Sequence, residues 1–566
     1  MIDPALGKVP VQISHSRNPI DLGKRGVPFP DLLIPSLRGI AFCGGFRTLA
    51  LVFLVIGASG TLTRAQAATP ARPNILFIMT DDHATQAIGA YGSRVNQTPN
   101  LDRLGAQGLR LDRCYAVNSI CTPSRATLLT GQYSHRNGVP VFNDLDPART
   151  TVAHRMRDAG YYTAMIGKWH LGSDPQGFDH WEILPGQGRY NDPILYDSDG
   201  HRIYRGYVTD IITRLTREVL EKRPKDRPFF VMCHHKAPHR EWTPSDRYRR
   251  EFALRTIPEP PTLWDDHAGR ADALREQRQS IFRNLSRYDL KLTPPEDLSP
   301  GDRQRWLNEV PTEVSWMVDG HPTVLRGRDL DRWKYQRYMQ DYLGCVQSVD
   351  DSVGELMAWL DSNGLRENTL VLYTSDQGFF LGEHGMYDKR FMYEPSSRMP
   401  FLARWPAGIR PGSTSEALAI NCDFAPTFLE LAGARIPEDM QGRSLVPLFQ
   451  GKTPTSWRNE IYYRYYHDPG HHNTRAHYGI RTATHKLIHY WKADQWELFD
   501  LVQDPDELRN RYADADQAGR VADLKARLRR LQADLGDTGQ FTGELPKDTV
   551  DRRQRQMDRK HPDSEL

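Results

Sequence analysis

The sequence predicts an α/β fold in which a large, mixed but mostly parallel sheet is sandwiched by helices. Short apolar runs bounded by polar residues are typical of strands buried on both faces of a parallel sheet. Four such runs span 74–80, 162–166, 229–233 and 369–373. Residues at helical spacing lie between them, at 150–159, 208–222 and 333–360. Strands that alternate with helices indicate a sheet covered on both sides.

The N-terminal part of the chain differs from the rest. An apolar run at 49–56 follows two arginines and precedes the small residues Ala65 and Ala67, which is the arrangement of a secretory signal peptide. We therefore expect residues 1–67 to be an N-terminal extension and signal peptide, removed by cleavage near Ala67. The apolar run is too short for a comfortable transmembrane helix. The mature protein is predicted to be periplasmic or secreted, without stable membrane insertion.

Three further regions follow this segment. Residues 68–458 are predicted to form the main domain, with an insertion at about 247–332 that is rich in Pro, Arg and Asp and has weak periodicity. Residues 459–536 are predicted to form a small antiparallel sheet with a covering helix, from patterns at 460–466, 478–490, 496–501 and 521–535. Residues 537–566 are polar and charged, and we expect them to be a mobile tail.

Composition excludes several kinds of partner and site. The 566 residues include 74 Lys and Arg against 71 Asp and Glu, scattered rather than in blocks, so the net charge of +3 does not indicate nucleic-acid binding. Six cysteines in so long a chain form no disulfide framework, and none has the C-x-x-C spacing of a zinc site. One or two disulfides stay open among Cys114, Cys233, Cys345 and Cys422.

Chemically capable side chains follow each of the four predicted strands. In chain order they are Asp81 and Asp82, Lys168 and His170, His239, and Asp376 and Gln377. In open α/β sheets, ligands bind beyond the carboxyl ends of the strands. We therefore expect these side chains to meet at one site.

A separate segment, Cys121-Thr-Pro-Ser-Arg125, is predicted to open a helix. Pro123 suits a first helical position because it has no N–H to lose, and Arg125 lies one turn from Cys121 on the same face. A helix start with a guanidinium beside it stabilises an anion. A lone cysteine is more often a buried core residue, but the residues that follow, Ala-Thr-Leu-Leu-Thr-Gly, argue against that interpretation.

Cys-x-Pro-x-Arg followed by Leu-Leu-Thr-Gly resembles the signature of the type I sulfatases of the alkaline phosphatase superfamily. In that family the cysteine is oxidised after translation to formylglycine (3-oxoalanine), whose hydrate is the nucleophile. The resemblance implies a sulfuric ester hydrolase with an alkaline phosphatase-like fold, whose catalytic domain is 68–458. It also implies Cys121 as the modified residue and a formylglycine-generating maturation enzyme as a partner.

Carboxylates at two of the strand ends predict a metal site. Close carboxylates repel each other unless a cation lies between them, and an all-oxygen ligand set suits a hard cation, Ca²⁺ better than Mg²⁺. The resemblance implies one bound Ca²⁺ that also takes an oxygen from modified Cys121. The remaining ligands would be Asp81, Asp82, Asp376 and Gln377, and many members of the family have Asn or His at the last position.

Catalytic roles are implied by the same resemblance. Three cations would bind the sulfate oxygens and offset their charge, namely Arg125, Lys168 and Lys389. His239 would protonate the leaving oxygen, and His170 would act as a base. His384 would lie in a second layer behind them.

The substrate is inferred from the C-terminal part of the chain. The segments 471–481, 496–501 and 504–510 resemble a bacterial branch that includes N-acetylglucosamine-6-sulfatases acting on glycosaminoglycans and mucins, so 6-O-sulfated N-acetylglucosamine is the predicted substrate. Candidate sugar-binding residues are His384, His471, His472, Arg475, His477 and Arg481. Three alternatives stay open: a sulfatase for algal polysaccharides such as ulvan or carrageenan, a phosphonate monoester or phosphodiester hydrolase, and an inactive sulfated-glycan lectin in which Cys121 is unmodified.

Overall fold

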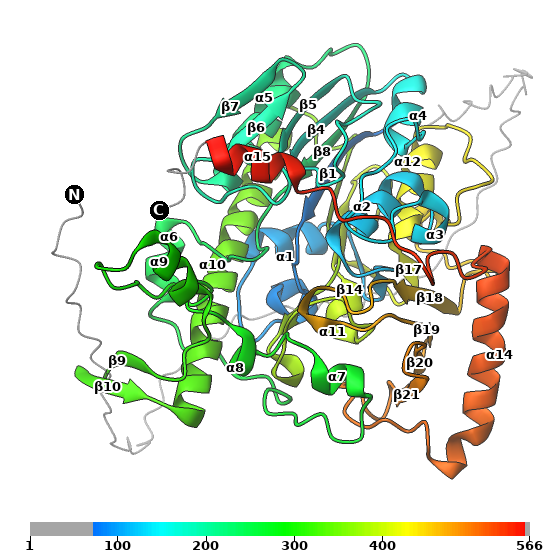
Figure 1. Ribbon diagram of the computed structural model, residues 1–566. Helices are drawn as coiled ribbons and strands as arrows, with labels where there is room; N and C mark the ends of the chain where they lie inside the picture. The colour runs from blue at the N-terminus through cyan, green and yellow to red at the C-terminus, as the bar shows by residue number, and fades with distance from the viewer. Residues whose placement is uncertain (1–71, 561–566) are drawn as a thin grey trace, which may run out of the picture. The chain divides into compact units, whose positions relative to one another are not determined.

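A ten-stranded sheet forms the centre of the protein, whose computed structural model describes residues 72–560 (Figure 1). In pairing order its strands are β16 (Ser413–Ser415), β2 (Leu109–Leu111), β15 (Phe401–Arg404), β11 (Thr369–Ser375), β1 (Asn74–Thr80), β8 (Phe229–His234), β4 (Tyr162–Lys168), β5 (His180–Leu184), β6 (Ile194–Asp197) and β7 (Gly200–Ile203). The five neighbours from β11 to β5 are parallel, and β15, β6 and β7 pair antiparallel. The predicted mixed, mostly parallel sheet is confirmed.

The four strands predicted from apolar runs are the four adjacent strands β11, β1, β8 and β4. Their side chains are buried on both faces; in β1, for example, every residue from Ile75 to Met79 is fully buried. Burial on both sides explains why these strands are continuous apolar runs and not alternating patterns. Three of them extend past the predicted ends, β8 to His234, β4 to Lys168 and β11 to Ser375. The polar residues at these ends therefore lie along one edge of the sheet.

Helices cover both faces of the sheet (Figure 1). On one face, Leu76 and Ile78 of β1 pack in a core with α1 (Pro99–Ala106), α5 (Val208–Lys222) and α10 (Gly327–Ser362). On the other face, Ile75, Phe77 and Met79 pack in a core with α2 (Cys121–Thr130), α4 (Val152–Asp158), α12 (Phe424–Leu431) and α13 (Val446–Phe449). The three helices predicted from periodicity are α4, α5 and α10.

The segment predicted as an insertion consists of short elements. They are α6 (Asp246–Phe252), α7 (Asp272–Glu276), α8 (Ile281–Asn284), α9 (Pro300–Asn308), β9 (Val314–Val318) and β10 (His321–Leu325). Leu263, Ile281 and Leu285 of this segment are buried in the same apolar core as α10. These residues therefore join the existing core and do not build one of their own.

A second, four-stranded antiparallel sheet follows the main one in sequence. Its strands are β18 (Glu460–Tyr465), β19 (His477–Thr482), β20 (His485–Tyr490) and β21 (Gln495–Asp500). Leu524 and Leu528 of α14 (Ala518–Leu535) pack with Ile480 and Leu487 of this sheet. The predicted small sheet with a covering helix is confirmed, except that the stretch 478–490 forms two strands joined by a turn.

Shorter elements complete the part of the chain that the structure describes. Three short strands pair as β14 (Arg398–Met399), β3 (Cys114–Tyr115) and β17 (Ala419–Ile420), and two more as β12 (Phe380–Leu381) and β13 (Tyr387–Asp388). Two one-turn helices are α3 (Ser134–Asn137) and α11 (Glu394–Ser397). Within the described residues all five cysteines are free, so the four that were candidates for disulfides are unpaired.

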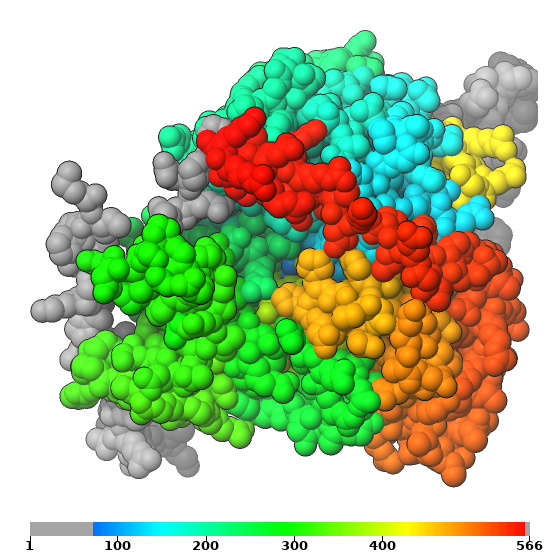
Figure 2. Space-filling model, viewed as in Figure 1, coloured from blue at the N-terminus to red at the C-terminus, as the bar shows by residue number. Residues whose placement is uncertain are grey.

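The C-terminal residues 548–560, called the C-terminal strap below, differ from the predicted mobile tail. They end in a helix, α15 (Arg552–Lys560). Figure 2 draws them in red, lying across the face of the molecule that is turned to the viewer. Val550 and Met557 are each only 4% exposed, and Asp558 pairs with Arg189 at 2.6 Å. Two buried apolar side chains and several polar contacts hold this segment, which has too few apolar residues to show a period in the sequence.

The predicted signal segment and the extension before it lie outside the described residues. Among the helices within 72–560, none is both long enough and apolar enough to cross a membrane.

The packing of Phe77 leads to a stability prediction. Its ring is fully buried and lies 5.4 Å from Phe428 and 5.8 Å from Phe424, measured between ring centroids. Phe77→Ala should reduce the free energy of unfolding by about 3–5 kcal/mol, because it leaves a cavity at the centre of the sheet. The measurement is chemical denaturation followed by circular dichroism. Leu254→Ala, at a 70% exposed position, is the control and should change stability by no more than about 0.5 kcal/mol; equal losses would contradict the described packing.

Candidate active site

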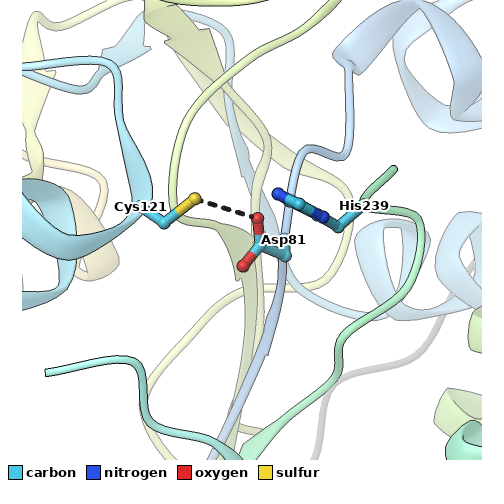
Figure 3. Close-up of side chains that lie close together, drawn as sticks. All are labelled: Asp81, Cys121 and His239. Carbon is cyan, nitrogen blue, oxygen red and sulfur yellow. Dashed lines mark hydrogen bonds between the residues drawn. The ribbon is translucent and has the colours of Figure 1, made fainter. Parts of the chain in front are cut away.

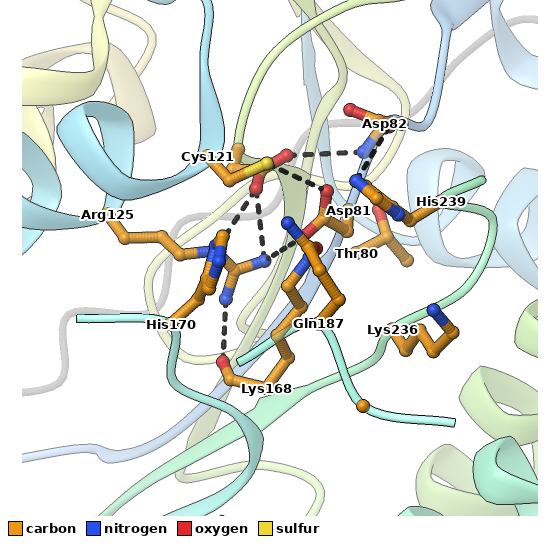
Figure 4. Close-up of polar contacts among 12 residues, drawn as sticks. Thr80, Asp81, Asp82, Cys121, Arg125, Lys168, His170, Gln187, Lys236 and His239 are labelled. Atoms are coloured by element: carbon orange, nitrogen blue, oxygen red, sulfur yellow. Dashed lines mark hydrogen bonds and ion pairs between the residues drawn. The ribbon is translucent and has the colours of Figure 1, made fainter. Parts of the chain in front are cut away.

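The carboxyl ends of the four central strands bring the predicted side chains together with Cys121 (Figure 4). Asp81 and Asp82 follow β1, Asp376 follows β11, and Lys168 ends β4. All four are at most 1% exposed. Because these strands are neighbours, their ends meet, and the N-terminus of α2 adds Cys121 to the same place. The predicted convergence of strand ends on one site is what the structure shows.

Arg125 connects the elements of the site. One turn after Cys121, its Nη2 lies 2.9 Å from Asp81 Oδ2 and its Nε donates to Asp376 Oδ2 at 3.1 Å. Its Nη1 donates to the backbone oxygen of Lys168 at 2.6 Å. One planar guanidinium thus links α2 to the ends of three strands. The resulting geometry places residue 121 directly over the carboxylates.

The thiol of Cys121 is not in an environment that favours a thiolate. Its Sγ lies 3.4 Å from Asp81 Oδ1 (Figure 3), and the residue is 1% exposed. Burial raises the pKa of this thiol far above its ordinary value, and the charge of Asp81 raises it further. The sequence predicted that the helix start and Arg125 would favour an anion here, but the guanidinium is already paired with two carboxylates. The unmodified side chain is therefore a poor nucleophile.

Three carboxylates, those of Asp81, Asp82 and Asp376, offer oxygen atoms within 4.8 Å of one another. Burial raises the pKa of Asp82 to about 8, although Lys389 opposes the shift. Burial and the charge of Asp81 raise the pKa of Asp376 to about 6. Burial is the main cause of both shifts, and the charges of the neighbouring carboxylates add to it, whereas nearby cations hold the pKa of Asp81 well below its ordinary value. A hard cation would relieve this repulsion.

Gln377 provides a further observation that fits a cation. Its Nε2 donates to Asp82 Oδ1 at 2.5 Å, while its buried Oε1 has no hydrogen-bond partner among the described residues. A buried amide oxygen without a donor is rare in proteins. Carboxylate and amide oxygens are the ligands that Ca²⁺ prefers. The residues present therefore fit the predicted calcium site.

Two lysines flank the carboxylates. Lys168 pairs with Asp81, and its Nζ also donates to Gln187 Oε1 at 2.5 Å. Lys389 Nζ lies 2.5 and 2.6 Å from the two oxygens of Asp82. Both ammonium groups are almost completely buried, so each depends on its carboxylate for compensation. Lys389 also lines the cavity described below, so its positive charge lies where the predicted sulfate would bind.

The two predicted histidines lie on opposite sides of this cluster. His239 Nδ1 and the backbone oxygen of Arg240 are 2.5 Å apart, which directs Nε2 towards Asp82 at 3.8 Å. His170 Nδ1 faces the hydroxyl of Thr122 at 3.3 Å. Burial lowers the pKa of both rings, so both are neutral at ordinary pH before an anion binds.

A cavity of about 230 Å³ opens above Cys121. Among the predicted site residues, its lining includes Asp82, Cys121, His239, Lys389, His471 and His472. The other lining residues were not predicted from the sequence; they are Phe142, Gln187, Arg240, Trp242, Phe379, Asp388, Arg390, Asp548, Thr549, Val550, Asp551 and Arg555. Asp388 and Arg390 flank a predicted residue, Lys389, so proximity in the chain was a usable signal for them. Nothing in the local sequence indicates that the strap lines the cavity.

Four of the predicted sugar-binding residues do not reach this cavity. His477 is fully buried and donates from Nδ1 to Arg475, while its Nε2 accepts from the backbone of Met392. Arg481 is paired with Glu394 at 3.0 Å. Both side chains therefore stabilise the small sheet and its contacts.

The other two also have polar partners elsewhere. Arg475 pairs with Asp468 at 3.1 Å. His384 Nδ1 lies 2.8 Å from Asp265 Oδ2, at a second cavity. Arg475 and His384 were predicted because arginine and histidine are suited to bind a sugar. The residue type alone does not show which group in the folded chain each side chain contacts.

Comparison with known proteins identifies related chains. The Sulfatase family model matches residues 73–434, and the model for the C-terminal region of N-sulphoglucosamine sulphohydrolase matches residues 382–534. An N-acetylglucosamine-6-O-sulfatase of Bacteroides thetaiotaomicron is 46% identical over 489 residues, which cover 82% of this chain and 87% of that protein. The human N-acetylglucosamine-6-sulfatase is 26% identical, over 87% of this chain and 90% of its own.

Solved structures support the same relationship. A protein in complex with its substrate D-glucosamine-2-N,6-O-disulfate is similar to this chain with a TM-score of 0.78 and 44% identity, over 84% of this chain and 100% of that one. A phosphonate monoester hydrolase of Agrobacterium radiobacter shares the fold, with a TM-score of 0.61 at 22% identity, over 82% of this chain and 96% of that one. From the family match and the 46% identity, the chain belongs to the sulfatase family of the alkaline phosphatase superfamily and is a sulfuric ester hydrolase.

Proposed function

We propose that this sulfatase removes the 6-O-sulfate from N-acetylglucosamine or glucosamine residues of glycosaminoglycan or mucin glycans. The observation that carries the proposal is the cavity above Cys121, which has buried cations at its base and a volume of about 230 Å³. This volume is below the range of about 300–1,000 Å³ for drug-sized ligands, so it suits a single sulfated sugar. The relatives named above, which act on 6-sulfated glucosamine derivatives by their names, support the choice of sugar.

The proposal includes conversion of Cys121 to formylglycine. An un-ionised thiol beside three carboxylates is poorly suited to attack a sulfate ester, whereas the hydrate of an aldehyde supplies an oxygen nucleophile there. The surrounding oxygens and ammonium groups suit such an oxygen. The modification requires a maturation enzyme, and the signal sequence predicted at 49–56 supports export to the periplasm or outside the cell.

Ca²⁺ is the proposed metal. Asp81, Asp82, Asp376 and Gln377 would hold it, as the clustered carboxylates and the unpartnered Gln377 Oε1 suggest. When bound, the ion supplies charge stabilisation and activates the oxygen nucleophile.

The protein side chains would then divide the reaction between them. Lys389, which lines the cavity, would hold positive charge directly against the sulfuryl oxygens, and Arg125 and Lys168, buried behind it, would add to the same electrostatic stabilisation, which usually contributes most to such transfers. The anionic sulfate raises the proton affinity of His239, whose Nε2 gives a proton to the departing sugar oxygen. His170 takes a proton from residue 121 at the end of the cycle.

Substrate preference is the first prediction from this proposal. The enzyme should hydrolyse 6-O-sulfated N-acetylglucosamine with a kcat/KM at least about 10-fold above that for ulvan oligosaccharides, carrageenan oligosaccharides or an aryl phosphonate. Sulfate release across this panel, measured by ion chromatography, is the test. A higher kcat/KM on an algal oligosaccharide or on the phosphonate would show that the proposed substrate is wrong.

A second prediction concerns the nucleophile. Cys121→Ser should release at most about one equivalent of product per enzyme, because serine has no second hydroxyl from which the sulfate could be expelled. Product counting in a single-turnover assay tests this. Cys114→Ser replaces another buried thiol, in β3, and should keep multiple turnovers. Sustained turnover by Cys121→Ser would exclude the proposed mechanism, and mass analysis of the peptide spanning Cys121 checks the modification itself.

Removal of the metal gives a third prediction. Dialysis against EGTA should lower both activity and the unfolding temperature, because three buried carboxylates then lose their compensating cation. Ca²⁺ at about 100 times its Kd should restore about 2.7 kcal/mol of stability. Asp82→Asn, which removes one proposed ligand, should make the unfolding temperature much less sensitive to Ca²⁺. Unfolding temperatures that respond to neither EGTA nor Ca²⁺, with no metal by elemental analysis, would contradict the calcium site.

A further inference from the structure

The C-terminal strap forms one wall of the active-site cavity. The backbone N–H groups of Thr549 and Val550 donate to the backbone oxygen of Phe142 at 2.7 and 3.2 Å. Thr549 Oγ1 donates to Asp144 Oδ1 at 2.6 Å, and Val550 is buried. These contacts hold the strap against the loop that follows α3. Figure 2 shows it in red, with a hollow between it and the orange residues.

The other end of the strap is held near the cluster of buried charges. Arg553 of α15 pairs with Asp174 at 2.6 Å, and Gln554 Oε1 accepts from the backbone N–H of Gly188 at 3.0 Å. Gly188 follows Gln187, which accepts from Lys168. Both matched family regions end before the strap, at residues 434 and 534. The strap is therefore a part of the site that lies outside the matched regions.

Asp551 of the strap contacts a proposed catalytic histidine. Its Oδ1 lies 3.1 Å from His170 Nε2. The imidazole is fully buried, while the carboxylate is 31% exposed. The opposite ring nitrogen, Nδ1, lies 3.3 Å from the hydroxyl of Thr122, the residue after Cys121. This hydroxyl also lies 2.9 Å from the backbone oxygen of His170 and can donate its proton to either atom. His170 thus lies between the strap and the residue proposed as nucleophile.

The geometry determines which nitrogen of His170 carries a proton. An ionised carboxylate can only accept hydrogen bonds, so Asp551 requires a proton on Nε2. Burial opposes ionisation of Asp551, but the hydrogen bond from His170 holds its pKa below the ordinary value. Because burial keeps the ring neutral, Nδ1 is then the nitrogen without a proton. A carboxylate orients the histidine in Ser-His-Asp enzymes in the same way.

We propose that Asp551 is a positioning residue for the desulfation reaction, which holds the proton of neutral His170 on Nε2 and keeps Nδ1 available to accept a proton at residue 121. The inference rests on the proposed function in one respect, the role of His170 as a base. The inference makes the strap a part of the active site, because Asp551, far beyond the main sheet in the sequence, sets the tautomer of His170.

Asp551→Asn in the full-length enzyme is the test. The amide of asparagine can donate to Nε2, which allows the proton to move to Nδ1. We expect kcat for 4-nitrophenyl sulfate to fall at least about 10-fold with KM changed by less than about 2-fold. In the unmodified thiol protein, ¹⁵N NMR of the histidine rings should show His170 changing from the Nε2–H to the Nδ1–H tautomer. His170→Gln assigns its signals.

Two controls separate this role from support of the fold. Asp558→Asn removes the ion pair between α15 and Arg189, and Asp558 neither contacts His170 nor lines the cavity. This variant should lower kcat by less than about 3-fold. In a His170→Ala background, Asp551→Asn should cost less than about 2-fold, because its effect passes through the imidazole. An unchanged tautomer and kcat in Asp551→Asn, or an equal loss with and without His170, would overturn the inference.

The substrates keep this test distinct from that of the proposed function. The aryl sulfate reports the chemical step without the sugar. If 6-sulfated N-acetylglucosamine is not hydrolysed but aryl sulfate hydrolysis and the tautomer respond to Asp551→Asn, the substrate proposal fails and the role of Asp551 stands. If the sugar is hydrolysed but neither aryl sulfate hydrolysis nor the tautomer of His170 responds to Asp551→Asn, the substrate proposal stands and the role of Asp551 fails. Were the enzyme inactive on both, the tautomer of His170 would still decide whether Asp551 positions it.

Discussion

The pairing of Arg125 with Asp81 and Asp376 is the interaction on which the arrangement of the site depends. Each carboxylate lies at the end of a different central strand, and the guanidinium also binds the backbone at the end of a third. A planar group with five donors can make these contacts at once, which a lysine could not. Because buried charges are tolerated only when paired, the three strand ends and α2 hold one another in place. Cys121, one turn away on the same helix, is positioned as a consequence.

The charges of the buried cluster also explain how a nearly neutral protein can bind an anion. Asp81, Asp82 and Asp376 are compensated by Arg125, Lys168 and Lys389, so the cluster as it stands is formally close to neutral. A divalent cation among the carboxylates would make it positive and release the ammonium groups to face the cavity. The net charge of the whole chain, only +3, contributes little by comparison. Under the proposed mechanism, attraction for the sulfate would thus be local and would depend on occupancy of the metal site.

Much of this site could be predicted from sequence, because the central strands are buried on both faces and read as continuous apolar runs whose polar ends are easy to see. The parts that could not be predicted depend on contacts between distant segments. His477 and Arg481 have the residue types of a sugar site, but their partners are Met392 and Glu394, which only the folded chain brings near. The strap gave no periodic signal, since two apolar side chains and a set of polar contacts suffice to hold it against the preformed site.

Burial of Cys121 also bears on when its proposed maturation takes place. Every residue of α2 is buried in the folded protein, and the cysteine itself is 1% exposed. An enzyme that oxidises this side chain has to bind the residues around it, and the folded chain does not present them. Arg125, which would have to be exposed together with Cys121, is held by three strand ends. If Cys121 is oxidised as proposed, its maturation would have to precede the docking of α2 onto the sheet, because the packing that positions residue 121 also covers it.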